Sequence, residues 1–168
     1  MAAWHRVAKQ RSTIWCVVGK FADDVKGFDV DTVKKMELVA RLVLLRVYSE
    51  IIKKSPVLSG RFRSNWAVAI GSIPSGTDDS DTFPEGDVVG SDTGPIISAK
   101  VSEGEATLFG LNAGDTIYMA NNLPYAQVLE NGRTTSSGSI QAPNGMVGLT
   151  VQEFQEFVNE IALKVSYT

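Results

Sequence analysis

The side chains best suited to nucleophilic or metal chemistry are scarce in this chain of 168 residues. Its one histidine, His5, and its one cysteine, Cys16, can act together as imidazole and thiol in covalent catalysis. No third residue nearby in sequence would orient them, and a zinc site needs three or four His or Cys ligands. The glycine motifs of phosphate loops, dinucleotide folds and nucleophile elbows are missing too. We therefore expect no enzyme, no cofactor and no metal site.

A second group of interest is the acidic segment 75–92, which is rich in Gly, Ser and Asp and holds no base. Its acids are Asp78, Asp79, Asp81, Glu85, Asp87 and Asp92. An EF-hand does not fit, because the sixth position counted from Asp79 is Pro84, where that loop requires glycine. A looser Ca²⁺ or Mg²⁺ site stays open as an alternative. A connection this long is typical of a functional loop, such as a mobile flap or a negatively charged inner surface.

Basic residues form two modest groups. Arg61 and Arg63 follow Gly60, which permits a tight turn, and lie near the start of an expected strand, where alternate residues of an extended segment face the same side. They can contact an acidic partner or a phosphate, or else pair within the fold with Glu130 or a helix acid. Residues 1–22 carry four bases and no acid, although the whole chain has a net charge of −3. That acidic balance argues against a protein that binds nucleic acid mainly through phosphates.

Apolar periodicity predicts the elements that position these residues. The strongest helix is expected over 31–54, capped by Asp29 or Asp31 and ended by Pro56. Two apolar stripes follow spacings of three and four residues. They are Val33, Met36, Ala40, Val43, Val47 and Ile51, and Leu38, Leu42, Leu45 and Ile52. An apolar arc this wide indicates a helix that is enclosed within the fold or shared with another subunit.

Strands are expected at about 65–73 and at 116–120, and helical segments at 95–109 and 124–129. The last helix is expected to begin with Thr150 as its cap and Glu153 as the second half of a capping box. Its apolar stripe is Val151, Phe154, Phe157 or Val158, Ile161 and Val165. Two strands make a marginal sheet, so a further strand or a partner's edge is expected.

The predicted fold class is α+β, with the long amphipathic helix and the C-terminal helix packed on a small, mostly antiparallel sheet with long loops. Residues 1–20 contain Trp4 and Trp15 but show no clean periodicity, so we expect a basic aromatic arm, helical or extended. Residues 21–168 are expected to form one domain. The apolar runs are too short or too interrupted by charge for a signal peptide or a membrane span, so no membrane contact is expected.

Three segments together resemble a known family. They are residues 55–66 (SPVLSGRFRSNW) after the long helix, residues 117–132 (IYMANNLPYAQVLENG) and residues 141–147 (QAPNGMV). Their order and spacing resemble the tail-completion, or neck, proteins of siphophages and related prophages, described as head–tail joining or morphogenesis proteins. The resemblance covers about 21–165 and leaves out the arm and the acidic loop. Leu58 and Ser59 stand where the family usually has an acid and a threonine, so any capping role of that acid is lost.

The resemblance implies a structural virion protein, made in the host cytoplasm, that forms a ring at the head-proximal end of the phage tail. The implied partners are further copies, in a hexamer, the tail tube protein and a head-completion or adaptor protein, with genomic DNA passing unbound through the channel. In such a ring the acids Asp78, Asp79, Asp81, Glu85 and Asp87 would face the channel and repel DNA. Neutralising all six acids of the loop, with Asp92 included, is then expected to slow DNA passage without blocking assembly.

Alternatives are a tail tube terminator or head-closure ring of the same neck. Outside that class they are a small hydrolase or metal-binding protein and a DNA-binding morphogenesis factor. The residues that the resemblance marks as motif or interface are Pro56, Gly60, Arg61, Arg63, Trp66, Asn121, Asn122, Pro124, Tyr125, Glu130, Gly132, Gln141, Pro143, Gly145 and Met146.

Physical chemistry gives several of these residues a folding role. Trp66 is expected to anchor the first strand on the core. Asn121 and Asn122 are expected to satisfy backbone groups where the second strand ends. Gly132 is expected to end the following helical turn, and Met146 to supply an adaptable apolar contact.

Overall fold

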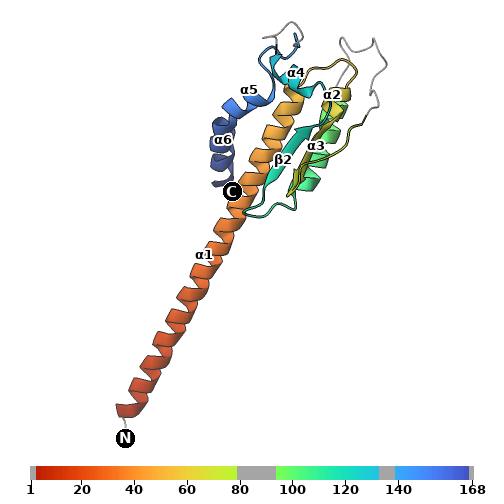
Figure 1. Cartoon of the computed structure of the whole chain (residues 1–168). Helices are drawn as coiled ribbons and strands as arrows, with labels where there is room; N and C mark the ends of the chain where they lie inside the picture. Colours follow the sequence, from red (N-terminus) through yellow and green to blue (C-terminus); the bar gives the residue numbers. More distant parts are fainter. Residues whose placement is uncertain (1–2, 79–93, 133–138, 167–168) are drawn as a thin grey trace. The chain divides into compact units, whose positions relative to one another are not determined.

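The computed structural model describes residues 3–78, 94–132 and 139–166 and confirms a small α+β fold (Figure 1). The elements in chain order are α1 (Ala3–Lys54), α2 (Arg61–Ser64), β1 (Trp66–Ile70), α3 (Gly94–Leu108), β2 (Ile117–Asn121), α4 (Ala126–Glu130), α5 (Val147–Gln152) and α6 (Phe154–Ser166). The chain divides into two compact units, Met1–Met36 and Glu37–Thr168. Helix α1 contributes to both of them.

The start predicted for the long helix is wrong. The helix was expected over 31–54 and begins instead at Ala3, so residues 3–20 are helical and Asp31 lies in the helix interior rather than at a cap. No proline precedes Pro56, and the two glycines of this stretch, Gly19 and Gly27, weaken a helix without breaking it. The predicted end of the helix, just before Pro56, is confirmed.

The sheet pairs β1 with β2 in an antiparallel register, from Trp66 opposite Asn121 to Ile70 opposite Ile117. The further strand that was expected does not occur among the described residues, where the sheet has two strands. Helices stabilise it instead. A Cβ added at Gly104 of α3 would meet the Tyr48 ring of α1 at 2.8 Å and Val68 of β1 at 3.6 Å. The glycine that weakens α3 therefore allows these three elements to pack closely.

Within the unit Glu37–Thr168, the C-terminal part of α1 lies between the sheet and the helices α5 and α6 (Figure 1). On one side, the Tyr48 hydroxyl donates to the Trp66 carbonyl oxygen at 2.8 Å. On the other side, Lys54 pairs with Glu153, and the Arg46 guanidinium lies 5.4 Å from the centre of the Phe157 ring. This enclosure accounts for the wide apolar arc of the helix from Val43 to Ile52.

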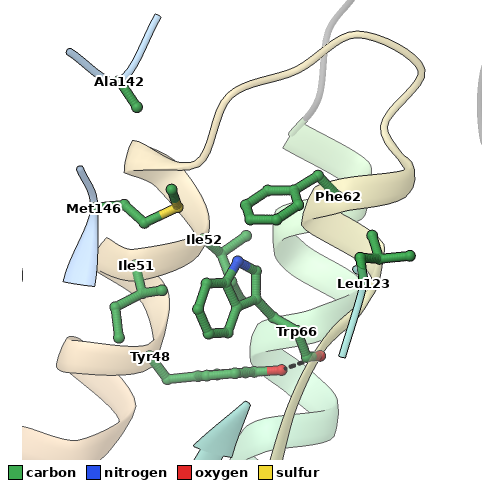
Figure 2. Packing of buried hydrophobic residues seen from close by; sticks show 8 residues of the cluster. All are labelled: Tyr48, Ile51, Ile52, Phe62, Trp66, Leu123, Ala142 and Met146. Carbon is green, nitrogen blue, oxygen red and sulfur yellow. Dashed lines mark hydrogen bonds between the residues drawn. The ribbon is translucent and has the colours of Figure 1, made fainter. Parts of the chain in front are cut away.

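The core forms where α1 meets α2, β1 and the loops after β2 and before α5. Its buried cluster is Tyr48, Ile51, Ile52, Phe62, Trp66, Leu123, Ala142 and Met146 (Figure 2). The Phe62 and Trp66 rings meet edge to face at 6.0 Å. Both predicted stripes contribute buried residues at their C-terminal ends, whereas Leu38 and Leu42 stay exposed.

The capping box predicted for the last helix is wrong. Two helices, α5 and α6, occupy this region, and Thr150 lies fully buried inside α5, where its hydroxyl donates to the Met146 carbonyl at 2.8 Å. Glu153 lies between the two helices. The buried face of α6 is set by Phe157 and Val165, while Val151 and Phe154 are exposed. Among the residues with defined positions, no helix has the length and apolarity needed to cross a membrane.

Candidate functional site

The three motif segments converge at one end of the unit Glu37–Thr168, where α1 ends and where α2, α4 and the start of α5 meet (Figure 1). We call this region the motif junction and define it as residues 55–66, 121–132 and 141–148. Three buried members, one from each segment, belong to a single cluster: Phe62, Leu123 and Met146. Segments that are separate in the sequence are thus parts of one structural site.

Arg63 holds the first segment against the end of α1. Its Nε donates to the Ser55 carbonyl and its Nη2 to the Lys53 carbonyl, both at 2.8 Å. These are C-terminal carbonyl groups that the helix itself leaves without partners. Burial lowers the pKa of Arg63 below its usual range. The expected placement of Arg61 and Arg63 on one side of an extended segment before the strand is wrong, because both lie in α2.

A short buried network of polar contacts connects the first and third segments of the junction to α1. The Ser55 hydroxyl donates to the Ile51 carbonyl at 2.7 Å and accepts from Trp66 Nε1 at 2.8 Å. The Met146 sulfur lies 3.2 Å from the same hydroxyl. Trp66 is therefore anchored on the core, as expected, and its backbone carbonyl is bonded by Tyr48 (Figure 2). Because each polar side-chain atom of Tyr48, Ser55 and Trp66 has a partner, these three residues can be buried without a large desolvation cost.

Asparagine amides fix the backbone around the ends of the strands. Asn121 Nδ2 donates to the Phe62 carbonyl at 2.8 Å, and its Oδ1 accepts from the Leu123 amide at 3.3 Å. Asn122 Nδ2 donates to the carbonyls of Pro74 and Gly76. Asn65 bonds both the amide and the carbonyl of Asp78, at 2.7 and 2.8 Å. The expected role of Asn121 and Asn122 is present, and Asn65 adds a second clamp.

Glu130 binds the start of α5. Its Oε2 accepts the amide hydrogens of Met146 and Val147 at 3.0 Å, and its Oε1 accepts that of Gly148 at 2.8 Å. These amides at the helix N-terminus have no partner within the helix, and an anion there is favoured by the helix dipole. The Glu130 carboxylate therefore bonds backbone amides, and not Arg61 or Arg63 as in the alternative considered from the sequence.

Two glycines let the second and third segments approach each other. Gly132 and Gly145 both have positive φ, at 63° and 76°. A Cβ at Gly132 would overlap the Pro143 carbonyl, and a Cβ at Gly145 would overlap the Glu130 carbonyl. Gly132 follows the last residues of α4 in the left-handed conformation, as expected for a helix end. Any side chain at Gly145 would push Glu130 away from α5.

Gln141 attaches the third segment to the first. Its Oε1 accepts the Val57 amide at 2.7 Å, and its Nε2 donates to the Val57 carbonyl at 2.8 Å. The Gln141 side chain thus forms with Val57 the two hydrogen bonds that a paired residue of a neighbouring strand would form. Pro124 and Pro143 are exposed on the surface of the junction.

An apolar groove of about 440 Å³ opens beside this attachment. Its lining residues are Pro56, Val57, Leu58, Ser59, Phe62, Tyr125, Val128, Leu129, Ser139 and Gln141. The Tyr125 ring lies 6.0 Å from that of Phe62, and Leu58 and Val128 are 78% and 40% exposed. Arg63 and Glu130 are engaged with backbone groups, and the groove offers a partner mainly apolar and aromatic surface.

Several predicted site residues lie outside the described part of the chain. Asp79, Asp81, Glu85, Asp87 and Asp92 fall in the undescribed range, and the side chains of His5 and Cys16 are also outside it. Asp78 is described, and its backbone is bonded by Asn65. Among the residues that the structure does describe, no three His, Cys, Asp or Glu side chains are grouped to hold a metal ion.

Sequence reasoning missed two residues that organise the junction, Tyr48 and Ser55. Tyr48 lies three residues after Leu45 and four before Ile52, so its place in the second apolar stripe is the signal that identifies it. Ser55 gave no such signal, because its partners come from three separate elements.

In comparisons with known proteins, no protein-family model, curated protein or solved structure matches the chain.

Proposed function

We propose that this chain is a structural ring component of a tailed-phage neck, which completes the head-proximal end of the tail and joins it to the head. The observation that carries the proposal is the convergence of the three family-like segments in one junction. Their polar residues lock the loops together, and their apolar residues line a groove on the surface. Such a site is built for assembly with other proteins.

In this proposal the junction contacts the neighbouring copy in the ring. Repeated heterologous contacts between identical subunits close a ring when the rotation allows it. Exposed aromatic and aliphatic side chains such as Tyr125, Leu58 and Val128 are typical of the centre of an interface. A tail tube terminator or head-closure ring would use the same contact, and the position of the ring in imaged necks distinguishes these roles.

The test is assembly of the full chain with the tail tube and head-completion proteins of the same phage. We expect co-purification and rings in negatively stained images. Leu58→Asp on the junction should abolish the rings, whereas Leu163→Asp, at a 59% exposed leucine of α6, should leave them intact. A persistent monomer without affinity for either partner would overturn the proposal.

A further inference from the structure

The first part of α1 forms a compact unit of its own, Met1–Met36. Every residue of that unit with a described exposure is exposed, including three apolar ones: Val30 at 51%, Val33 at 42% and Met36 at 67%. Helical segments in water depend mostly on packing of an apolar face rather than on intrinsic propensity. A helix of this length with a pronounced apolar pattern therefore requires a packing partner.

The sequence of this helix has a heptad repeat. Apolar residues recur at alternating spacings of three and four, with one interruption at Arg11. They are Trp4, Val7, Ile14, Val18, Phe21, Val25 and Phe28. A repeat of 3.5 residues over more than three heptads is the pattern of a coiled coil. Gly19 and Gly27 both fall outside these positions. The repeat is not visible in residues 1–20 alone, because Arg11 interrupts it there. Its uninterrupted part runs from Ile14 to Phe28.

We propose that residues 4–28 pair with the same residues of a second copy of this chain in an antiparallel coiled coil. The charge distribution selects both the partner and the direction. Residues 3–22 carry four bases and no acid, and residues 23–31 carry four acids and one base. With Trp4 opposite Phe28, antiparallel pairing places residues 3–9 of each copy, which carry Arg6 and Lys9, beside residues 23–29 of the other, which carry Asp23, Asp24 and Asp29, whereas parallel pairing places like charges together.

The register agrees with this direction. Aligning Trp4 with Phe28 of the second copy also aligns Val7 with Val25 and Ile14 with Val18. Each residue at heptad position a of one helix then faces a residue at position d of the other. The interrupting Arg11 then lies opposite Phe21, where a guanidinium can stack on an aromatic ring. In a parallel pair, Arg11 would face Arg11 in the middle of the apolar seam.

This pairing does not rest on the ring proposal. An antiparallel pair has a two-fold axis and uses the same surface on both copies, whereas a ring closes through two different surfaces. The helix pair and the junction are therefore separate contacts, and a variant of one should leave the other intact.

Disulfide trapping in the full chain tests the direction. In a Cys16→Ser background, chains carrying Val7→Cys and Val25→Cys are oxidised separately and as a mixture. We expect the mixture to give a crosslinked pair at least about tenfold faster than either variant alone. In the antiparallel register two copies of position 7 are 18 residues apart along the helix, or about 27 Å at about 1.5 Å per residue. Equal crosslinking of each variant alone, or no crosslinking in any sample, would refute the proposal.

Sedimentation equilibrium tests the seam itself. Val18→Asp should raise the dimer dissociation constant at least about tenfold, because it buries a carboxylate between the helices. Ser12→Asp introduces the same charge outside the seam and should leave the constant within about twofold. The Leu58→Asp variant, which breaks the proposed ring, should still form the helix pair. A Val18→Asp variant that dimerises like the unchanged chain would contradict the seam.

Discussion

Glu130 shows how one side chain can connect two segments that the sequence does not relate. Its carboxylate accepts three backbone amides at the start of α5, from residues 16 to 18 positions later in the chain. Helix α5 has no side-chain cap of its own at Met146. The carboxylate therefore replaces the local cap and holds α4, the third motif segment and α5 together.

Replacing Glu130 by Gln should destabilise the fold by about 1.5–3 kcal/mol, because hydrogen bonds to a charged acceptor are lost and an amide nitrogen is placed against backbone donors. Urea denaturation of the two proteins measures the difference. The control is Glu105→Gln on the exposed face of α3, for which we expect a change within about 0.5 kcal/mol. Equal effects of the two substitutions would show that Glu130 does not hold α5.

Tyr48 gives the fold a dependence on alkaline pH. Burial, with a smaller contribution from the charge of Glu103, raises the pKa of its hydroxyl above the ordinary value of 10.0. Above pH 10 the unfolded chain loses this proton while the folded chain keeps it, so the free energy of unfolding falls as the pH rises.

The variant Tyr48→Phe should lose this contribution and show a shallower fall in stability between pH 10 and 11 than the unchanged protein. At pH 7 it should be about 1–3 kcal/mol less stable, since the buried Trp66 carbonyl loses its donor. Denaturation at a series of pH values measures both effects. Parallel pH curves for the two proteins would contradict this role of the hydroxyl.

At the scale of elements, local patterns predicted most of the fold. The alternation in β1, the proline after α1 and the asparagines after β2 each act within a few residues, and the structure has the strands, the helix end and the hydrogen bonds expected from them. Thr150 and Glu153 have the spacing of a capping box, yet packing of α5 buries Thr150 and Lys54 pairs with Glu153. Tertiary contacts outweighed the local signal there.

The motif junction was less predictable than the strands. Sequence marked its residues by resemblance, but not the contacts between them, because Arg63, Glu130 and Gln141 all bond backbone groups of other segments. Backbone groups carry no residue-type signal, so such pairs cannot be inferred from the letters of one sequence.

Helix α6 offers a matched test of how it packs. Phe157 is 7% exposed and lies beside Arg46, whereas Phe154, one turn earlier, is 44% exposed. Phe157→Ala should cost about 3–5 kcal/mol, and Phe154→Ala less than half of that. Thermal or urea denaturation measures both values. Similar losses for the two variants would mean that α6 does not pack on α1 through the Phe157 face.

At the scale of the whole molecule, the two units of the chain should respond differently to protein concentration. If residues 4–28 pair between copies, their amide hydrogens become protected as the dimer forms, by the mass action that couples binding to stability. Protection of residues 44–54, which lie against the core, should not change. Hydrogen exchange at two concentrations, about a hundredfold apart, measures this, and concentration-independent protection of residues 4–28 would contradict the pairing.

The burial of Met146 has a consequence for oxidative damage. Met146 has no exposed surface, whereas Met36 is 67% exposed. Peroxide therefore reaches the thioether of Met36 in the folded protein, but reaches that of Met146 only when the junction opens. A sulfoxide at Met146 would place a polar group against the Ser55 hydroxyl in the core and hinder reclosure. The ratio of the two sulfoxides in an aged preparation thus records how often the junction has opened.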